Sequence, residues 1–220
     1  MKVFISAGHG GSDPGAVANG VKEKDLNLSI ALACQAFLQK HGVEVRMSRM
    51  GDENDPLSDE IRECNAYAPD LAVSIHNNAG GGDGAEVFHH HGGGKGKTLA
   101  ENILSEIVKV GQNSRGAKVR KNSSGKDYYG FIRETSAPAV IVECAFVDNA
   151  NDLKIIATES DRQKVGQAVA RGILKTLGVE IQSEKGYWKV QVGACLYRES
   201  AEDLQRKIKA VGFDAFIVRE

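Results

Sequence analysis

Short apolar segments alternate with longer segments of helical periodicity along most of the chain. Runs of β-branched and aromatic residues, or alternation with a period of two, are typical of strands and predict them at residues 3–5, 43–47, 71–75, 85–88 and 139–142. Apolar residues at three- and four-residue steps predict helices at residues 23–41, 58–67, 97–110 and 161–177. Residues 111–130 are polar and interrupted by glycine, so loops with short strands are expected there. Strands separated by helices indicate an α/β fold with a mixed, mostly parallel sheet flanked by helices on both faces.

The pattern changes after residue 177, which divides the chain into an expected main domain at 1–177, a polar linker at 178–186 and a small unit at 187–220. In this unit, a strand pattern around Trp188, a short helix around Leu204 and a strand pattern at 213–218 predict one βαβ motif. A motif this small lies below ~40 residues, the size under which a fold usually needs further stabilisation, for example by oligomerisation. It is therefore expected to pack on the main domain or to pair with a copy from another chain.

Composition excludes several functional classes. The chain has 220 residues, and 28 Lys and Arg balance 29 Asp and Glu, so there is no global positive charge to attract nucleic acid. A hydrophobic content of 41% is ordinary for a globular protein. No run of about 18 apolar residues occurs, so membrane insertion is not expected. The first residues lack the apolar core of a secretory signal peptide, which predicts a cytoplasmic location.

The four cysteines are far apart and form no Cys-x-x-Cys pair. Their spacing excludes a cysteine zinc knuckle and argues against a disulfide framework. All four have apolar neighbours and are expected to be buried free thiols. Cys144 also stays open as a nucleophile, since it follows the expected strand 139–142.

Three polar side chains follow strands of the expected sheet. His9 comes after the first strand, His76 after the third, and Glu143 ends the strand 139–142. Ligands of open α/β sheets bind beyond the carboxyl ends of the strands, so these groups are expected to surround one crevice. A single histidine in such a place is more often structural, and the argument depends on the convergence of all three.

Glu23 begins the first helix and can complete a metal site. Complementing the helix dipole would explain it equally well, with a contribution of ~0.3–1 kcal/mol. Two histidines and one glutamate, however, form a catalytic zinc set that leaves one position open. We therefore expect His9, Glu23 and His76 as zinc ligands. Glu143 is the candidate general base, and its structural alternative is an ion pair with Arg133 or Arg49.

The run His89 to His91 also suggests a metal site. Adjacent residues of a strand point to opposite faces of the sheet, so three consecutive imidazoles are not expected to share one ion.

Four segments of the sequence together resemble the zinc-dependent N-acetylmuramoyl-L-alanine amidases. The segments are 7–16, around His9; 23–28, which begins at Glu23; 74–79, around His76; and 140–149, around Glu143. The resemblance covers residues 1–177. It implies hydrolysis of the amide between N-acetylmuramic acid and L-alanine in peptidoglycan, with zinc on His9, Glu23 and His76 and with Glu143 as the catalytic glutamate. Arg62 and Asn65 resemble a further part of the family pattern, and no role is assigned to them.

Residues 187–218 are similar to one half of a SPOR domain, a module that binds the glycan strands of peptidoglycan. A SPOR domain contains two such halves, so the resemblance implies either a truncated chain or a homodimer in which each chain supplies one half. The size of the unit favours the homodimer.

Two alternatives to the amidase remain at this point. One is a wall-binding module without catalysis, which would need a broken ligand set, whereas all four positions are filled. The other is a zinc peptidase that cuts within the stem peptide. If the chain is a peptidoglycan hydrolase without a signal peptide, it would wait in the cytoplasm until lysis, as a phage endolysin or an autolysin of a spore-forming mother cell does.

Overall fold

The computed structural model describes residues 1–181 and 192–218. The chain forms two compact units, Met1–Gln182 and Ser183–Glu220. No helix in the described ranges combines the length and the apolar character that crossing a membrane requires.

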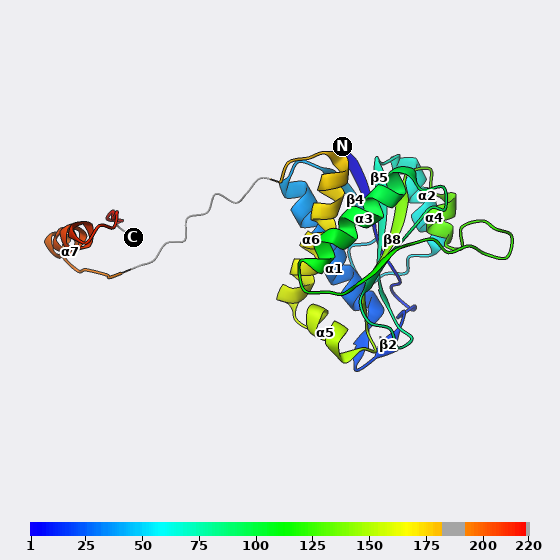
Figure 1. The fold of residues 1–220 in the computed structure, drawn as a ribbon, viewed down its shortest axis with the longest axis horizontal. Helices are drawn as coiled ribbons and strands as arrows, with labels where there is room; N and C mark the ends of the chain where they lie inside the picture. The colour runs from blue at the N-terminus through cyan, green and yellow to red at the C-terminus, as the bar shows by residue number, and fades with distance from the viewer. Residues whose placement is uncertain (182–191, 219–220) are drawn as a thin grey trace. The chain divides into compact units, whose positions relative to one another are not determined.

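A six-stranded sheet forms the centre of the first unit, between helices on either side (Figure 1). Its strand order is β4-β1-β5-β8-β6-β7. Its strands are β1 (Lys2–Ala7), β4 (Glu44–Met47), β5 (Leu71–Asn78), β6 (Ala85–His89), β7 (Ser114–Lys118) and β8 (Ala139–Phe146). Strands β4, β1, β5 and β8 are parallel neighbours, whereas β6 runs antiparallel to β8 and parallel to β7. The mixed, mostly parallel sheet predicted from the sequence is confirmed.

Helices cover both faces of the sheet because alternate strand residues are apolar on both. One face carries Val73, Val142 and their neighbours, which pack in one core with α1 (Glu23–Lys40), α3 (Gly94–Val108) and α6 (Glu159–Leu177). The other face carries Phe4, Ala72 and Ile141, which pack with α2 (Leu57–Tyr67) and α4 (Gly130–Glu134). The core on this second face is the smaller of the two.

Two strands are longer than the apolar pattern predicts. β5 continues to Asn78 and β8 to Phe146, so His76 and Glu143 lie within the strands rather than after them. Polar residues interrupt the apolar pattern there because they face a cavity instead of the core. Three further elements were not predicted from the sequence: α4, α5 (Ala150–Ile156) and the small hairpin of β2 (Val17–Ala18) and β3 (Val21–Lys22).

The second unit contains helix α7 (Arg198–Ala210). The strand predicted at 213–218 is not formed. Most of the other predicted strand, around Trp188, lies outside the described residues. The βαβ pattern of this unit is therefore described only for its helix.

The cysteines are free thiols in the described structure. Cys34, Cys64 and Cys144 are buried as expected, whereas the prediction is wrong for Cys195, which is exposed. Cys144 is fully buried in the core under α3 and α6, and burial raises the pKa of its thiol. A buried thiol of high pKa is inert, so Cys144 is not the nucleophile.

Candidate active site

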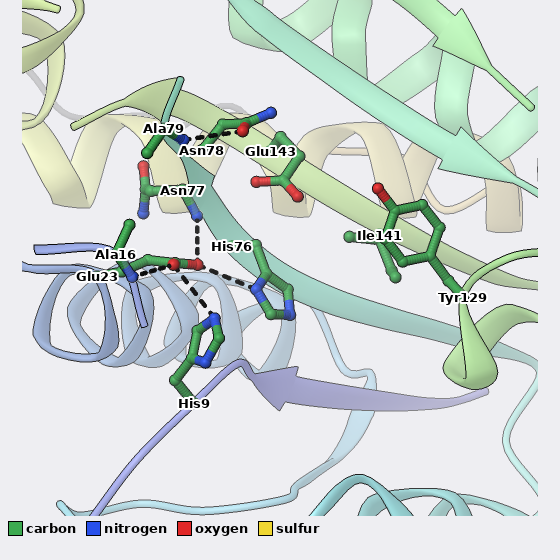
Figure 2. A pocket seen from close by; sticks show the side chains of 10 residues that line it. All are labelled: His9, Ala16, Glu23, His76, Asn77, Asn78, Ala79, Tyr129, Ile141 and Glu143. Atoms are coloured by element: carbon green, nitrogen blue, oxygen red, sulfur yellow. Dashed lines mark hydrogen bonds and ion pairs between the residues drawn. The ribbon is translucent and has the colours of Figure 1, made fainter. Parts of the chain in front are cut away.

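Four side chains from separate segments line one pocket of about 290 Å³ at the carboxyl end of the parallel strands (Figure 2). The register of β5 and β8 pairs His76 with Glu143, so the two lie side by side on the same face of the sheet. His9 follows β1, and Glu23 is the first residue of α1. The convergence predicted from the sequence is thus formed by all four residues. The other lining residues are Ala16, Asn77, Asn78, Ala79, Tyr129 and Ile141.

The carboxylate of Glu23 is the centre of the cluster. His9 Nε2 lies 3.2 Å from Glu23 Oε2, and His76 Nδ1 lies 3.0 Å from Glu23 Oε1. The two imidazole rings are perpendicular, with centroids 5.1 Å apart. One potential ligand atom from each of the three residues lies within 4.8 Å of the other two.

Backbone N–H groups and one side-chain amide hold the carboxylate of Glu23 in place by hydrogen bonds. The backbone N–H groups of Ala16 and Asn77 donate to its two oxygens at 2.9 and 3.2 Å. Asn27, one turn along α1, donates from Nδ2 to Glu23 Oε1 and to the carbonyl of Gly8. Glu23 is only 4% exposed, so this carboxylate is preorganised rather than solvated.

Two glycines make room for the rings. A Cβ on Gly8 would lie 2.1 Å from the ring of His76, and a Cβ on Gly15 would lie 2.6 Å from both His9 and Glu23. His9 itself has a φ of 64°, a conformation that costs non-glycine residues energy and that is common at functional sites.

A buried arginine ties the segments of the site together. Arg49 donates to the backbone carbonyls of Ala7, Gly8 and Lys24, which lie at the end of β1 and the start of α1. It is 3% exposed. Arg49 therefore holds the backbone just before His9 and just after Glu23. It does not pair with Glu143.

The ionisation of the cluster follows from its contacts. The hydrogen bond to Glu23 raises the pKa of His9 to about 9. Burial alone would raise the pKa of Glu23, but the hydrogen bonds from His76 and His9 outweigh it and hold this pKa well below its ordinary value. Glu23 is thus a carboxylate at neutral pH, as a metal ligand must be.

The donor set fits a divalent metal ion. Two imidazoles and one carboxylate suit zinc and leave one coordination position free. His9 Nδ1 is 2.7 Å from Asp13 Oδ2, so Asp13 accepts the Nδ1 proton and leaves Nε2, which faces Glu23, as the ring nitrogen that could bind a metal. A carboxylate behind a ligating histidine is the usual second partner at such sites. Sequence reasoning missed Asp13, although its place four residues after His9 was a signal.

Glu143 sits apart from this cluster, across the pocket (Figure 2). Its Oε2 atom is buried and has no hydrogen-bond partner in the described structure. Burial raises the pKa of Glu143 to about 7. Neither arginine considered as its partner contacts it, because Arg133 donates to the carbonyls of Asp127 and Tyr128 and to Glu134. An unpaired carboxyl group with a pKa near neutrality can both take up and release a proton.

Two further residues near the site were not identified from the sequence. Glu86 on β6 lies directly opposite Glu143 in the register, and its carboxylate binds Arg115, Lys118 and Asn78. Glu86 could have been noticed in the sequence, because it is a charged residue within an apolar strand. Tyr129 lines the pocket from the segment before α4, a position that no strand pattern could indicate. Arg62 and Asn65 lie elsewhere, in contacts with Asp59 and with the loop at 134–136.

The histidine run forms a second cluster with Asp127. His90 Nε2 and His91 Nδ1 lie 3.1 and 2.7 Å from Asp127 Oδ2. Two adjacent histidines converge because β6 ends at His89, and the strand geometry assumed in the sequence analysis does not apply to them. The N–H of Gly92 donates to His90 Nδ1, so a neutral His90 carries its proton on Nε2 and donates it to Asp127. This tautomer fits a hydrogen-bonded anchor rather than a metal ligand.

The fold and the pocket define a class of protein. It is an α/β protein whose pocket holds a candidate metal-binding group and an unpaired carboxyl group, and these two groups together are typical of a hydrolytic site. Comparison with known proteins gives the family. The family described as N-acetylmuramoyl-L-alanine amidase matches residues 3–175, and the SPOR domain matches residues 159–219. The chain belongs to the N-acetylmuramoyl-L-alanine amidase family, and it is a peptidoglycan hydrolase.

Individual relatives agree with this assignment. The chain is 34% identical to the sporulation-specific N-acetylmuramoyl-L-alanine amidase of Bacillus subtilis, over 99% of this chain and 84% of the relative. It is 35% identical to the endolysin of Bacillus phage SPP1, over 82% and 68%. Among solved structures, Cwp6 from Clostridium difficile superposes with a TM-score of 0.79 at 37% identity, covering 80% of this chain and 29% of that one.

Proposed function

We propose that the chain cleaves the amide between N-acetylmuramic acid and L-alanine with a zinc ion held by His9, Glu23 and His76. The observation that carries this proposal is the joint arrangement of three donor side chains around one point and of an unpaired Glu143 across the same pocket. When bound there, zinc would polarise the scissile carbonyl and acidify a water molecule.

Glu143 is proposed as the general base and acid. Its Oε2 atom has no partner in the described structure, so it is free to accept a proton from the attacking water. The same oxygen then delivers this proton to the leaving nitrogen of L-alanine. A pKa raised to about 7 suits both steps at neutral pH, because each protonation state is accessible.

The surroundings of Glu143 support this role. Ile141 and Tyr129 border the pocket beside it and keep its carboxyl group in an apolar, poorly solvated setting (Figure 2). Asn77 and Asn78 line the same pocket and offer amide groups that can orient the substrate. Two observations thus support the proposed roles: the candidate metal ligands line the same pocket as Glu143, and Glu143 Oε2 has no hydrogen-bond partner in the described structure.

Digestion of purified walls tests the proposal. The protein is loaded with zinc, and the products are identified by mass spectrometry. We expect free L-alanine amino termini and intact glycan strands. Glu143→Gln is expected to keep zinc and to lose about 10²–10⁴-fold in rate, which is the usual contribution of a general base. His76→Ala is expected to lose zinc as well. Normal activity of Glu143→Gln would remove the proposed base.

The same experiment decides between the alternatives. A zinc peptidase would leave the lactyl amide intact and release fragments of the stem peptide. A wall-binding module would release nothing. Protein that cleaves equally well after removal of all bound metal would refute the zinc site.

The SPOR match indicates that the second unit binds peptidoglycan. We further propose that two chains pair through this unit. No residue of α7 is buried, and Phe213 and Phe216 are 70% and 72% exposed, so the apolar residues of this unit have no core of their own in the described structure. Light scattering on the full chain is expected to give twice the 23.6 kDa of one chain. A monomeric mass would contradict the pairing.

We also propose that the enzyme meets its substrate when a cell lyses. The support is the names of two relatives, a sporulation-specific amidase and a phage endolysin. Fractionation of producing cells is expected to recover the protein with the cytoplasm before lysis and with the wall afterwards. Recovery from the wall of intact cells would contradict this setting.

A further inference from the structure

The segment between β7 and α4 carries an unusual concentration of positive charge. Residues 119–126, directly after β7, contain three Lys and Arg and no Asp or Glu, in a chain whose net charge is −1. Residues 119–128 of this segment, here called the arm, project from the body of the first unit beside α4 (Figure 1). The cations of the arm are Arg120, Lys121 and Lys126, and in the described part of the chain none of them has an acidic side chain within ion-pair distance.

Hydrogen bonds order the arm at its tip and hold it to the neighbouring segment at its base. At the tip, Asn122 Oδ1 accepts hydrogen bonds from the backbone N–H groups of Ser124 and Lys126. At the base, the buried Asp127 binds the imidazoles of His90 and His91. This explains the second histidine cluster as a structural anchor, and it means that the cations are presented from a fixed support.

Arg120 is the cation of the arm that lies next to the pocket. Its guanidinium stacks on the ring of Tyr128 at 3.9 Å from the centroid. Arg120 Nη1 donates to the hydroxyl of Tyr129 at 3.4 Å, and Tyr129 lines the pocket. A stacked guanidinium is preorganised and keeps its edge free for bidentate binding of a carboxylate.

The two edges of the pocket differ in charge. Beside His9, the exposed side chains are the carboxylates of Asp13 and Asp52, although Lys24 pairs with the latter. Beside Tyr129 lies Arg120. The pocket of about 290 Å³ is at the small end of the usual range of ~300–1,000 Å³, so it holds the scissile amide while the rest of the substrate lies on the surrounding surface.

We propose that Arg120 binds a free carboxylate of the stem peptide and so sets the direction in which the substrate lies across the site. This inference rests on the proposed amidase function. The stem peptide is the anionic part of the substrate and leaves the pocket toward the arm, whereas the glycan leaves toward His9. Lys121 and Lys126 add attraction at longer range. Arg120 is thus a specificity-determining residue, and amidation of the stem carboxylate removes its partner.

The test compares two forms of one wall preparation, one untreated and one with its carboxylates converted to amides by carbodiimide and ammonia. Initial rates of release of L-alanine amino termini are measured at subsaturating wall concentration. The wild-type protein is expected to cleave untreated walls about fivefold faster. Arg120→Gln is expected to lose this preference, and Arg120→Lys, which keeps the charge, to retain most of it. Higher salt is expected to shrink the preference, because the pair is exposed.

The control is Arg171→Gln. Arg171 also stacks on an aromatic ring, Phe37, but it lies on α6 away from the pocket. This variant is expected to keep the wild-type preference. Equal rates of the wild-type protein on both walls, or an unchanged preference in Arg120→Gln, would overturn the assignment of Arg120. Failure to release L-alanine termini from either wall would instead refute the proposed function itself.

Discussion

Replacement of Gly8 by alanine tests whether the tight packing of the histidine rings sustains the site. A Cβ at this position would lie 2.1 Å from Cε1 and 2.2 Å from Nε2 of His76. Ordinary contact begins at 3.4 Å, so the ring or the backbone must move by about 3.4 − 2.1 = 1.3 Å. The ring cannot swing away freely, because its Nδ1 is bound to the buried Glu23. Gly8 is also held by Arg49 and Asn27 through its carbonyl.

The expected consequence is a large loss of function with a smaller loss of stability. Overpacking of this kind costs about 1–3 kcal/mol, which the first unit can tolerate. A displacement of about 1 Å at a reacting centre costs ~10²-fold in rate. We therefore expect Gly8→Ala to fold, to bind zinc more weakly and to cleave walls at least about 10²-fold more slowly.

The assay combines urea unfolding, zinc titration and wall digestion on the same preparation. Gly96→Ala is the matched control, since a Cβ there meets nothing closer than 3.7 Å and the residue lies in α3. This control is expected to behave as wild type. If Gly8→Ala bound zinc and cleaved walls normally, the described packing of His76 against the Gly8 backbone would be wrong.

Three further perturbations separate other parts of the site. Asp13→Ala removes the carboxylate that accepts the Nδ1 proton of His9, and we expect it to weaken zinc binding about 10–100-fold in a competition titration. The free energy of unfolding is expected to stay unchanged, because Asp13 is exposed. A zinc affinity equal to that of the wild-type protein would show that Asp13 does not orient His9. Arg49→Met leaves buried backbone carbonyls without a donor and is expected to lower the free energy of unfolding by at least about 2 kcal/mol in urea; a stable variant would contradict this. Burial raises the pKa of Glu60 from 4.5 to about 7, so the folded state holds a proton that the unfolded state releases. The free energy of unfolding is therefore highest below pH 4.5 and falls by at most ~3 kcal/mol as the pH rises to about 7. Glu60→Gln is expected to flatten that slope in urea unfolding at pH 5 and pH 8, and an unchanged slope would show that Glu60 is not its source.

The local pattern of apolar residues predicted much of the fold. The helices α1, α2, α3 and α6 begin and end within a few residues of the limits that periodicity predicts, because each has one apolar stripe that must face the sheet. The prediction was poorest where a short element is defined by its neighbours. α4 has five residues and no period of its own, and the β2–β3 hairpin has two residues in each strand.

The candidate ligands could be named from the sequence because each follows a short apolar run or begins a helix. Their partners could not. Asn27 meets Asn77 across 50 residues of sequence, Arg49 meets Ala7 across 42 and Glu86 meets Arg115 across 29, and nothing in the local pattern indicates these distant partners.

The order of apolar and polar residues determined the α/β class. Together with the resemblance of four segments to a known family, it also pointed to the four side chains proposed for the chemistry, because these signals are local properties of the chain. Tertiary structure decided the rest. It set His76 beside Glu143 through the β5–β8 register, it left Glu143 Oε2 without a hydrogen-bond partner among the described residues, and it brought Arg120 next to Tyr129. These facts depend on which surfaces pack together in space, and burial and proximity are not encoded at any single position of the chain.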